Sequence, residues 1–68
     1  MAYRSNDVIR LESEFVDKYG ITRVLEMLAG ICDEKADHIK TNYGDTILAG
    51  RWKRKADIID IAAQKVSE

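Results

Sequence analysis

The sequence predicts a small all-α protein, with one domain over residues 1–68 and three helices at about residues 7–19, 22–43 and 45–66. Two observations indicate this class. Apolar residues recur every three or four positions in each segment, which is the spacing of one helix face, and no proline interrupts the chain. We expect the second and third helices to form a long antiparallel hairpin. The shorter first helix joins them in a bundle-like arrangement that self-association completes.

The first helix carries a single apolar stripe, made of Val8, Leu11, Phe15 and Tyr19. Either Ser5 or Asn6 can cap its start, because a short polar side chain accepts a hydrogen bond from the free amides of the first turn. Gly20 follows the last residue and suits the left-handed conformation that commonly ends a helix.

The second and third helices begin and end with similar residues. Thr22 and Asp45 are the predicted N-caps, and Gly44 ends the second helix as Gly20 ends the first. Because Tyr19-Gly20-Ile21-Thr22 resembles Tyr43-Gly44-Asp45-Thr46, we predict one capping geometry used twice. The core stripes are Leu25, Leu28 or Ala29, Cys32, Ala36 and Ile39 in the second helix, and Leu48, Trp52, Ala56, Ile59, Ala63 and Val66 in the third.

The short turn at Gly44 makes the two long helices antiparallel neighbours and predicts their register. Large side chains then face small ones along the hairpin, as dense packing requires. The predicted pairs are Leu25 with Ala63, Ala29 with Ile59, Cys32 with Ala56, Ala36 with Trp52, and Ile39 with Ala49. Gly30 and Gly50 lower helix stability. Either close helix approach, with Leu11 near Gly30, or local flexibility explains them.

Length and composition exclude several classes of protein. A chain of 68 residues has a marginal core, and its single cysteine, Cys32, cannot form a disulfide within the chain, which fits a reducing compartment. No segment reaches the roughly 20 apolar residues that span a membrane, and the N-terminus does not resemble a secretory signal. We therefore expect a cytoplasmic protein without membrane contact. The net charge of -1 argues against an obligate nucleic-acid binder.

Both long helices carry a second apolar flank outside the core stripe. The first helix can cover one flank but not both, and an uncovered flank on a small protein indicates an interface. We therefore predict a homodimer that also binds another protein; the alternative is a compact monomer with the first helix across both others. The predicted interface residues are Ile47, Arg51, Arg54, Ile58 and Ile61, together with Val24, Leu28 and Ile31.

The compact basic run Arg51-Trp52-Lys53-Arg54-Lys55 suggests an alternative, a small regulatory protein that binds nucleic acid. On a helix these side chains point in different directions, and Trp52 belongs to the core stripe. Lys53 is placed to pair with Asp57, four residues along. The alternative site is therefore Arg51, Arg54 and Lys55, and the preferred interpretation is a solvated helix face.

We expect no catalytic, metal or cofactor site. Glu34 and His38 lie one turn apart and could share a metal, but Cys32 faces the core and no third ligand joins them, so an ordinary surface pair is preferred. A buried thiol is unreactive. No serine accompanies His38 in its segment. The four glycines occur singly and form no phosphate-binding loop.

The segment from Tyr19 to Trp52, about half of the chain, resembles a group of small uncharacterised helical proteins from cyanobacteria, other bacteria and their phages. The resemblance implies a helical fold and an accessory role, and it assigns no site residue. The matching positions are Tyr19-Gly20, Val24-Leu25, Leu28-Ala29, Ile31-Cys32, the run from Glu34 to Ile39, Asp45, Leu48-Ala49 and Trp52. The sequence thus predicts a non-enzymatic, self-associating interaction protein.

Overall fold

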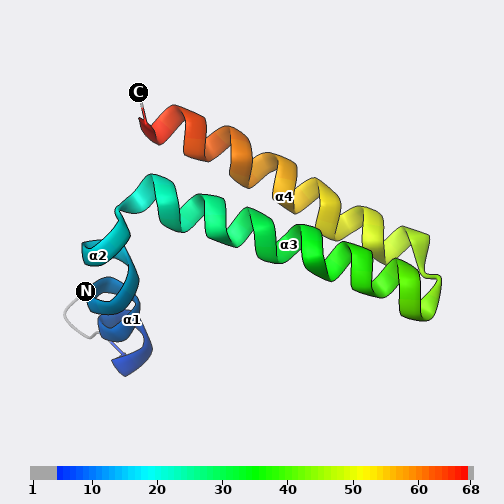
Figure 1. The fold of residues 1–68 in the computed structure, drawn as a ribbon, viewed down its shortest axis with the longest axis horizontal. Helices are drawn as coiled ribbons and strands as arrows, with labels where there is room; N and C mark the ends of the chain where they lie inside the picture. Colours follow the sequence, from blue (N-terminus) through cyan, green and yellow to red (C-terminus); the bar gives the residue numbers. More distant parts are fainter. Residues whose placement is uncertain (1–4, 68) are drawn as a thin grey trace.

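The computed structural model describes residues 5–67, which form a helical hairpin and a shorter arm. The arm, residues 6–19, comprises α1 (Asn6–Leu11), η1 (Glu12–Val16) and α2 (Asp17–Tyr19) in one continuous helical path. The hairpin comprises α3 (Ile21–Tyr43) and α4 (Thr46–Ser67), which run antiparallel side by side while the arm turns away at the start of α3 (Figure 1). The all-α hairpin is confirmed. Within residues 5–67 no helix is both long and apolar enough to cross a membrane.

The hairpin is held together by a seam of small residues. Five of the seven buried residues of the hairpin are alanines, and these alanines recur at seven-residue intervals within each helix, which is the repeat of a coiled coil. Ala56, at the middle of α4, has no exposed surface. Larger, partly buried residues alternate with them: Leu25, Ile39, Trp52 and Ile59. The buried seam residues are Ala29, Cys32, Ala36, Ala49, Ala56 and Ala63.

Contacts across the seam agree with the predicted register. The Lys35 ammonium lies 5.4 Å from the centre of the Trp52 ring, next to Ala36, the predicted partner of Trp52. Further along, Asp33 and Lys53 form an ion pair between the helices. Small residues opposite large ones let the two backbones approach and exclude water from the seam.

The hairpin turn is capped as predicted. Gly44 is left-handed, with φ 65° and ψ 16°, and its N–H donates to the carbonyl of Lys40 at 3.1 Å. The Asp45 carboxylate accepts a hydrogen bond of 2.9 Å from the N–H of Leu48, which starts α4. Two residues therefore reverse the chain and satisfy groups at both helix ends.

The turn at Gly20 differs, and the prediction of one capping geometry used twice is wrong. Gly20 has φ 87° and ψ 162°, an extended conformation at positive φ that is essentially restricted to glycine. It is the single residue between α2 and α3. Its N–H donates to Val16, and its carbonyl accepts from Val24. The predicted N-cap at Thr22 is also wrong, because α3 begins at Ile21 without a side-chain cap.

The arm departs from the regular helix that the sequence predicts. Ser5 caps it through a 3.2 Å hydrogen bond from the N–H of Val8. From Glu12 to Val16 the backbone is π-helical, which widens the turn and rotates the residues that follow around the axis. No residue of the arm is buried. The arm packs against α3 alone among the described elements of the hairpin, so the compact monomer with this helix across both others is not what forms.

The two interior glycines of the hairpin are not explained by close packing. A Cβ atom built at Gly30 or at Gly50 would meet nothing within 4 Å. Neither Leu11 nor the facing helix comes close enough to require a glycine at position 30 or 50. The close-approach interpretation is therefore wrong for both glycines.

Candidate interaction surfaces

The outer side of α4 carries an exposed stripe of isoleucines and arginines, here called the α4 stripe: Ile47, Arg51, Arg54, Ile58 and Ile61. Its isoleucines are 74%, 59% and 54% exposed, in chain order. The five residues follow one another at spacings of three or four positions, which places them on one side of the helix, away from the alanine seam. No described element other than α3 packs against α4. All five predicted interface residues of α4 are thus brought together on a free surface.

The predicted flank of α3 is partly covered by the arm. Val24 is only 9% exposed, so its assignment to a free surface is corrected: it belongs to the interior between the arm and α3. Leu28 and Ile31 remain 44% and 47% exposed. The arm therefore covers the α3 flank only at Val24, less than the sequence predicted, and leaves the flank of α4 open.

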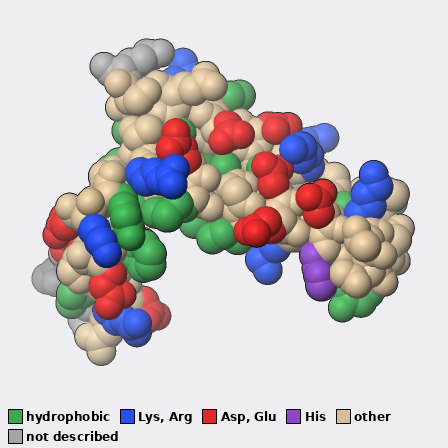
Figure 2. All heavy atoms as spheres, in the orientation of Figure 1, with side chains coloured by type: hydrophobic (Ala, Val, Ile, Leu, Met, Phe, Trp, Pro, Cys, Tyr) green, Lys and Arg blue, Asp and Glu red, His purple; other side chains and the backbone are tan. Residues whose placement is uncertain are grey.

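Sequence reasoning did not identify the groove between the arm and α3. This arm groove has a volume of about 190 Å³, and every residue that lines it is apolar. Figure 2 shows hydrophobic side chains gathered in the angle between the arm and the hairpin. The four-residue spacing of Leu11 and Phe15 was the available signal, but the direction of the arm was needed to place them. The lining residues are Leu11, Phe15, Val24, Met27, Leu28 and Ile31.

An acidic hollow adjoins the arm groove and shares Leu11 and Phe15 with it. Asp7, Arg10 and Glu14 complete its lining. Arg10 reaches Glu14 at 3.8 Å, a loose and exposed pair that contributes little to stability. The carboxylates therefore remain available to a positively charged partner.

The basic run of α4 does not form one cationic patch. Lys53 donates to Asp33 of α3 at 2.9 Å, so the predicted pairing with Asp57 is replaced by a pair across the hairpin. The hydrogen bond to Asp33 and the charge of that carboxylate raise the pKa of Lys53 above its ordinary value of 10.5. Lys55 lies 4.5 Å from the centre of the Trp52 ring. Trp52 thus lies partly buried at the edge of the seam, with Lys35 and Lys55 beside its ring.

The guanidinium groups of Arg51 and Arg54 are the uncommitted cations of this run. Both residues are exposed, and neither forms an ion pair within residues 5–67. They interrupt the isoleucines of the α4 stripe. A surface that combines apolar and acidic groups would therefore complement this stripe.

Of the residues considered for metal binding and catalysis, His38 has neighbouring polar and aromatic groups and Cys32 is buried. His38 Nδ1 lies 2.9 Å from the side-chain nitrogen of Asn42, and its ring meets the Tyr43 ring edge to face at 6.0 Å. Cys32 is a buried free thiol in the seam. Among the described residues no three histidine, cysteine or acidic side chains come together in a way that could hold a metal ion.

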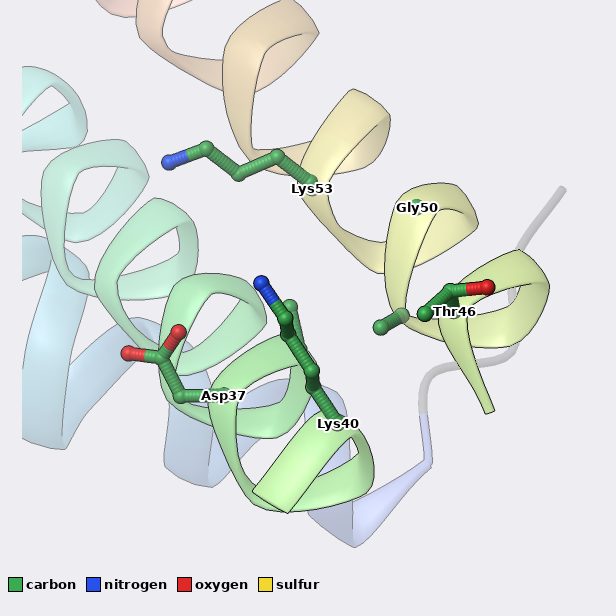
Figure 3. A pocket seen from close by; sticks show the side chains of 7 residues that line it. Asp37, Lys40, Thr46, Gly50 and Lys53 are labelled. Carbon is green, nitrogen blue, oxygen red and sulfur yellow. The ribbon is translucent and has the colours of Figure 1, made fainter. Parts of the chain in front are cut away.

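A hollow of about 340 Å³ lies beside the hairpin turn, where Gly50 leaves room between α3 and α4. Figure 3 shows Lys53 extending from α4 toward α3, away from Thr46 and Gly50. Asp37 and Lys40 border the hollow from α3. In residues 5–67 no polar or charged side chain is buried, so the charged groups that border this hollow are open to solvent.

Comparisons with protein families, with curated proteins and with solved structures found no match for this chain.

Proposed function

We propose that this protein is a small, non-enzymatic interaction protein that acts in the cytoplasm, self-associates as a dimer and binds a further protein. The observation that supports this function is the α4 stripe. Three isoleucines, each more than half exposed, share one side of α4, and no described element other than α3 packs against this helix. Removing such apolar surface from water contributes roughly 25 cal/mol per Å², so a partner that covers it is stabilised.

The size of the chain favours the same function. Its seam buries mostly alanines, which contribute less apolar area than larger residues, while many large apolar side chains stay exposed. Small domains commonly gain the missing core by association. A second copy of the same chain can supply this missing core.

Substitution of Ile58→Glu together with Ile61→Glu tests the proposal. Burying two carboxylates without partners opposes association, and we expect the dissociation constant to rise by about a hundredfold or more. Light scattering over a concentration series gives the mass of the wild-type chain and of the variant. Thr41→Glu with Gln64→Glu adds the same charge at exposed positions off the stripe and should leave the mass unchanged. A wild-type chain that is monomeric at millimolar concentration contradicts self-association.

Nucleic-acid binding by Arg51, Arg54 and Lys55 is the second candidate, because the two guanidinium groups lack partners within the described chain. Trp52 is partly buried, and Lys35 and Lys55 lie against its ring, so the ring is not free to stack on a base. This arrangement favours the interaction protein over the nucleic-acid binder. Binding of this kind would weaken steeply with salt. Fluorescence anisotropy of labelled single-stranded DNA and RNA at low salt measures it, and no change in anisotropy at millimolar protein removes this function.

A further inference from the structure

The hairpin has two broad sides of opposite character, one on each side of the alanine seam. Two hollows between α3 and α4 open on the side called here the polar side. Apart from seam alanines and Gly50, every residue that lines these two hollows is polar or charged. A third hollow, of about 450 Å³, opens on the opposite side, called here the Trp52 side. It is lined by Ile31, Glu34, Lys35, His38, Ile39 and Trp52.

Large apolar residues follow the Trp52 side along both helices. In α4, Trp52, Ile59 and Val66 recur every seven residues, which keeps them on one side of the helix. In α3, Ile31 lines both the hollow beside Trp52 and the arm groove, so the two form one apolar surface. Val66 is 51% exposed and Ile31 is 47% exposed. This surface lies where a three-helix bundle has its third helix, and the arm does not pack against α4 there.

The charges of the hairpin are divided between the same two sides. The ammonium groups of Lys35 and Lys55 lie 5.4 Å and 4.5 Å from the centre of the Trp52 ring, in the middle of the Trp52 side. Glu34 is the carboxylate that lines the hollow there, and its position in the helical turn directs it away from α4. On the polar side carboxylates outnumber lysines, and Figure 2 shows acidic side chains gathered on one face over both helices. The carboxylates of the polar side are Glu26, Asp33, Asp37 and Asp60, and its lysines are Lys40 and Lys53.

The shape and charge of the Trp52 side favour one kind of occupant. A groove between two antiparallel helices receives one further helix, at an interaxial distance of about 8–10 Å. A second copy placed face to face on this side would bring Lys35 and Lys55 of both chains into one interface, and like charges there oppose association. A helix with carboxylates beside its apolar face fits both the groove and the two lysines.

We propose that the further protein bound by this chain docks an acidic amphipathic helix on the Trp52 side and completes a three-helix bundle with α3 and α4. Its apolar side chains cover Ile31, Ile39 and the exposed part of Trp52, and its carboxylates pair with Lys35 and Lys55 at the edges of the contact. This inference rests on the binding of a further protein proposed above and names the chemistry of that partner. The α4 stripe, on the outer side of α4, stays free for self-association.

Trp52 is the only tryptophan of the chain, so its fluorescence reports on this side directly. The probe is a synthetic helical peptide of about five turns, without tryptophan, with leucines on one face and glutamates beside them. A matched peptide carries lysines in place of the glutamates. The acidic peptide should shift the Trp52 emission to shorter wavelength and bind at least about tenfold more tightly than the lysine peptide, as measured by anisotropy of labelled peptides. Equal affinities, or no binding of the acidic peptide at millimolar concentration, overturn the inference.

Charge reversal on the Trp52 side tests the role of the two lysines. Lys35→Glu together with Lys55→Glu should weaken binding of the acidic peptide about tenfold or more and strengthen binding of the lysine peptide. Lys40→Glu with Lys65→Glu makes the same change of charge away from this side and should leave both affinities as in the wild type. If the first variant loses helical circular dichroism, Lys35→Gln with Lys55→Gln replaces it and should weaken the acidic peptide in the same direction. Unchanged affinity in a folded variant of this pair overturns the inference.

The outcomes separate this inference from the proposed self-association. The Ile58→Glu, Ile61→Glu variant should bind the acidic peptide as the wild type does, and loss of binding there would place the peptide on the α4 stripe and overturn the inference. A Trp52 emission that shifts with protein concentration alone would mean that a second copy occupies this side, which also overturns it. A wild-type dimer that does not bind the acidic peptide overturns the inference and leaves self-association standing. A monomer that binds it through Lys35 and Lys55 contradicts self-association and supports the inference.

Discussion

The hairpin and the arm have similar fractions of apolar residues but use them differently. In the hairpin, small side chains face large ones and the alanine seam is buried. In the arm, the apolar side chains are large, and five of them stay between 42% and 49% exposed: Val8, Ile9, Leu11, Phe15 and Tyr19. An apolar stripe therefore becomes a core only when a complementary surface lies within reach of the same chain. The hairpin has one, whereas the arm packs only against the edge of α3 among the described elements of the hairpin.

The largest expected effect comes from adding volume to the seam. Ala56 has no exposed surface, so Ala56→Leu forces the two helices apart and should lower the free energy of unfolding by about 1–3 kcal/mol. Phe15→Leu, a comparable change of shape in the arm, should alter it by less than about 1 kcal/mol. Urea unfolding followed by circular dichroism, at concentrations where the chain is monomeric, measures both. Equal losses of unfolding free energy in the Ala56 and Phe15 variants would contradict the distinction between the buried seam and the arm.

The two glycine turns allow a second test. Gly20→Ala forces a side chain into a conformation that only glycine adopts readily, at a cost of about 1–3 kcal/mol, but the cost should be confined to the arm. Amide hydrogen exchange should then quicken in residues 6–19 while the hairpin keeps its protection. Gly44→Ala should instead destabilise the whole hairpin by about 1–2 kcal/mol. Gly44→Asn should cost less, because asparagine tolerates the left-handed region. Faster exchange throughout the hairpin in the Gly20 variant would contradict this division.

The seam could be predicted from sequence because its residues recur with the period of a helix. The recurrence of Trp52, Ala56, Ile59 and Ala63 identifies one helix face, and a short turn at Gly44 makes the two long helices antiparallel. The exposed stripe on α4 could be predicted for the same reason. A second set of apolar residues on a helix that already has a core face must lie elsewhere on its surface.

Features that depend on neighbours distant in sequence could not be predicted. A glycine indicates positive φ but does not specify ψ, so Gly20 and Gly44 look alike and fold differently. The long side chain of Lys53 can reach Asp57 on its own helix or Asp33 on the next, and only the relative position of α3 decides. Val24 is buried because the arm lies over it, and the direction of the arm follows from the backbone at Gly20.

Removing the interior glycines should strengthen the hairpin and sharpen its contrast with the arm. A methyl group at Gly30 or Gly50 meets nothing within 4 Å. Gly30→Ala and Gly50→Ala should each raise the free energy of unfolding by up to about 1 kcal/mol, because alanine loses less backbone freedom in a helix. Thermal unfolding at low concentration measures the change. A lower melting temperature in either variant would contradict the open space at that position.

The smallest effect concerns the ion pair that joins the hairpin helices. Because Asp33 raises the pKa of Lys53 above 10.5, the pair contributes fully at pH values below that of free lysine, and its contribution is lost as the pH rises through the higher folded value. The difference in unfolding free energy between wild type and Lys53→Met should therefore be small and constant near neutral pH. It should shrink toward zero above about pH 10.5 and be reduced by salt, because the pair is exposed. Arg23→Met removes the exposed pair with Glu26 within α3 and serves as the control. Arginine keeps its proton through this range, so that difference should not follow the same alkaline decline. A Lys53→Met difference that stays constant to high pH would mean that Lys53 and Asp33 do not couple the two helices.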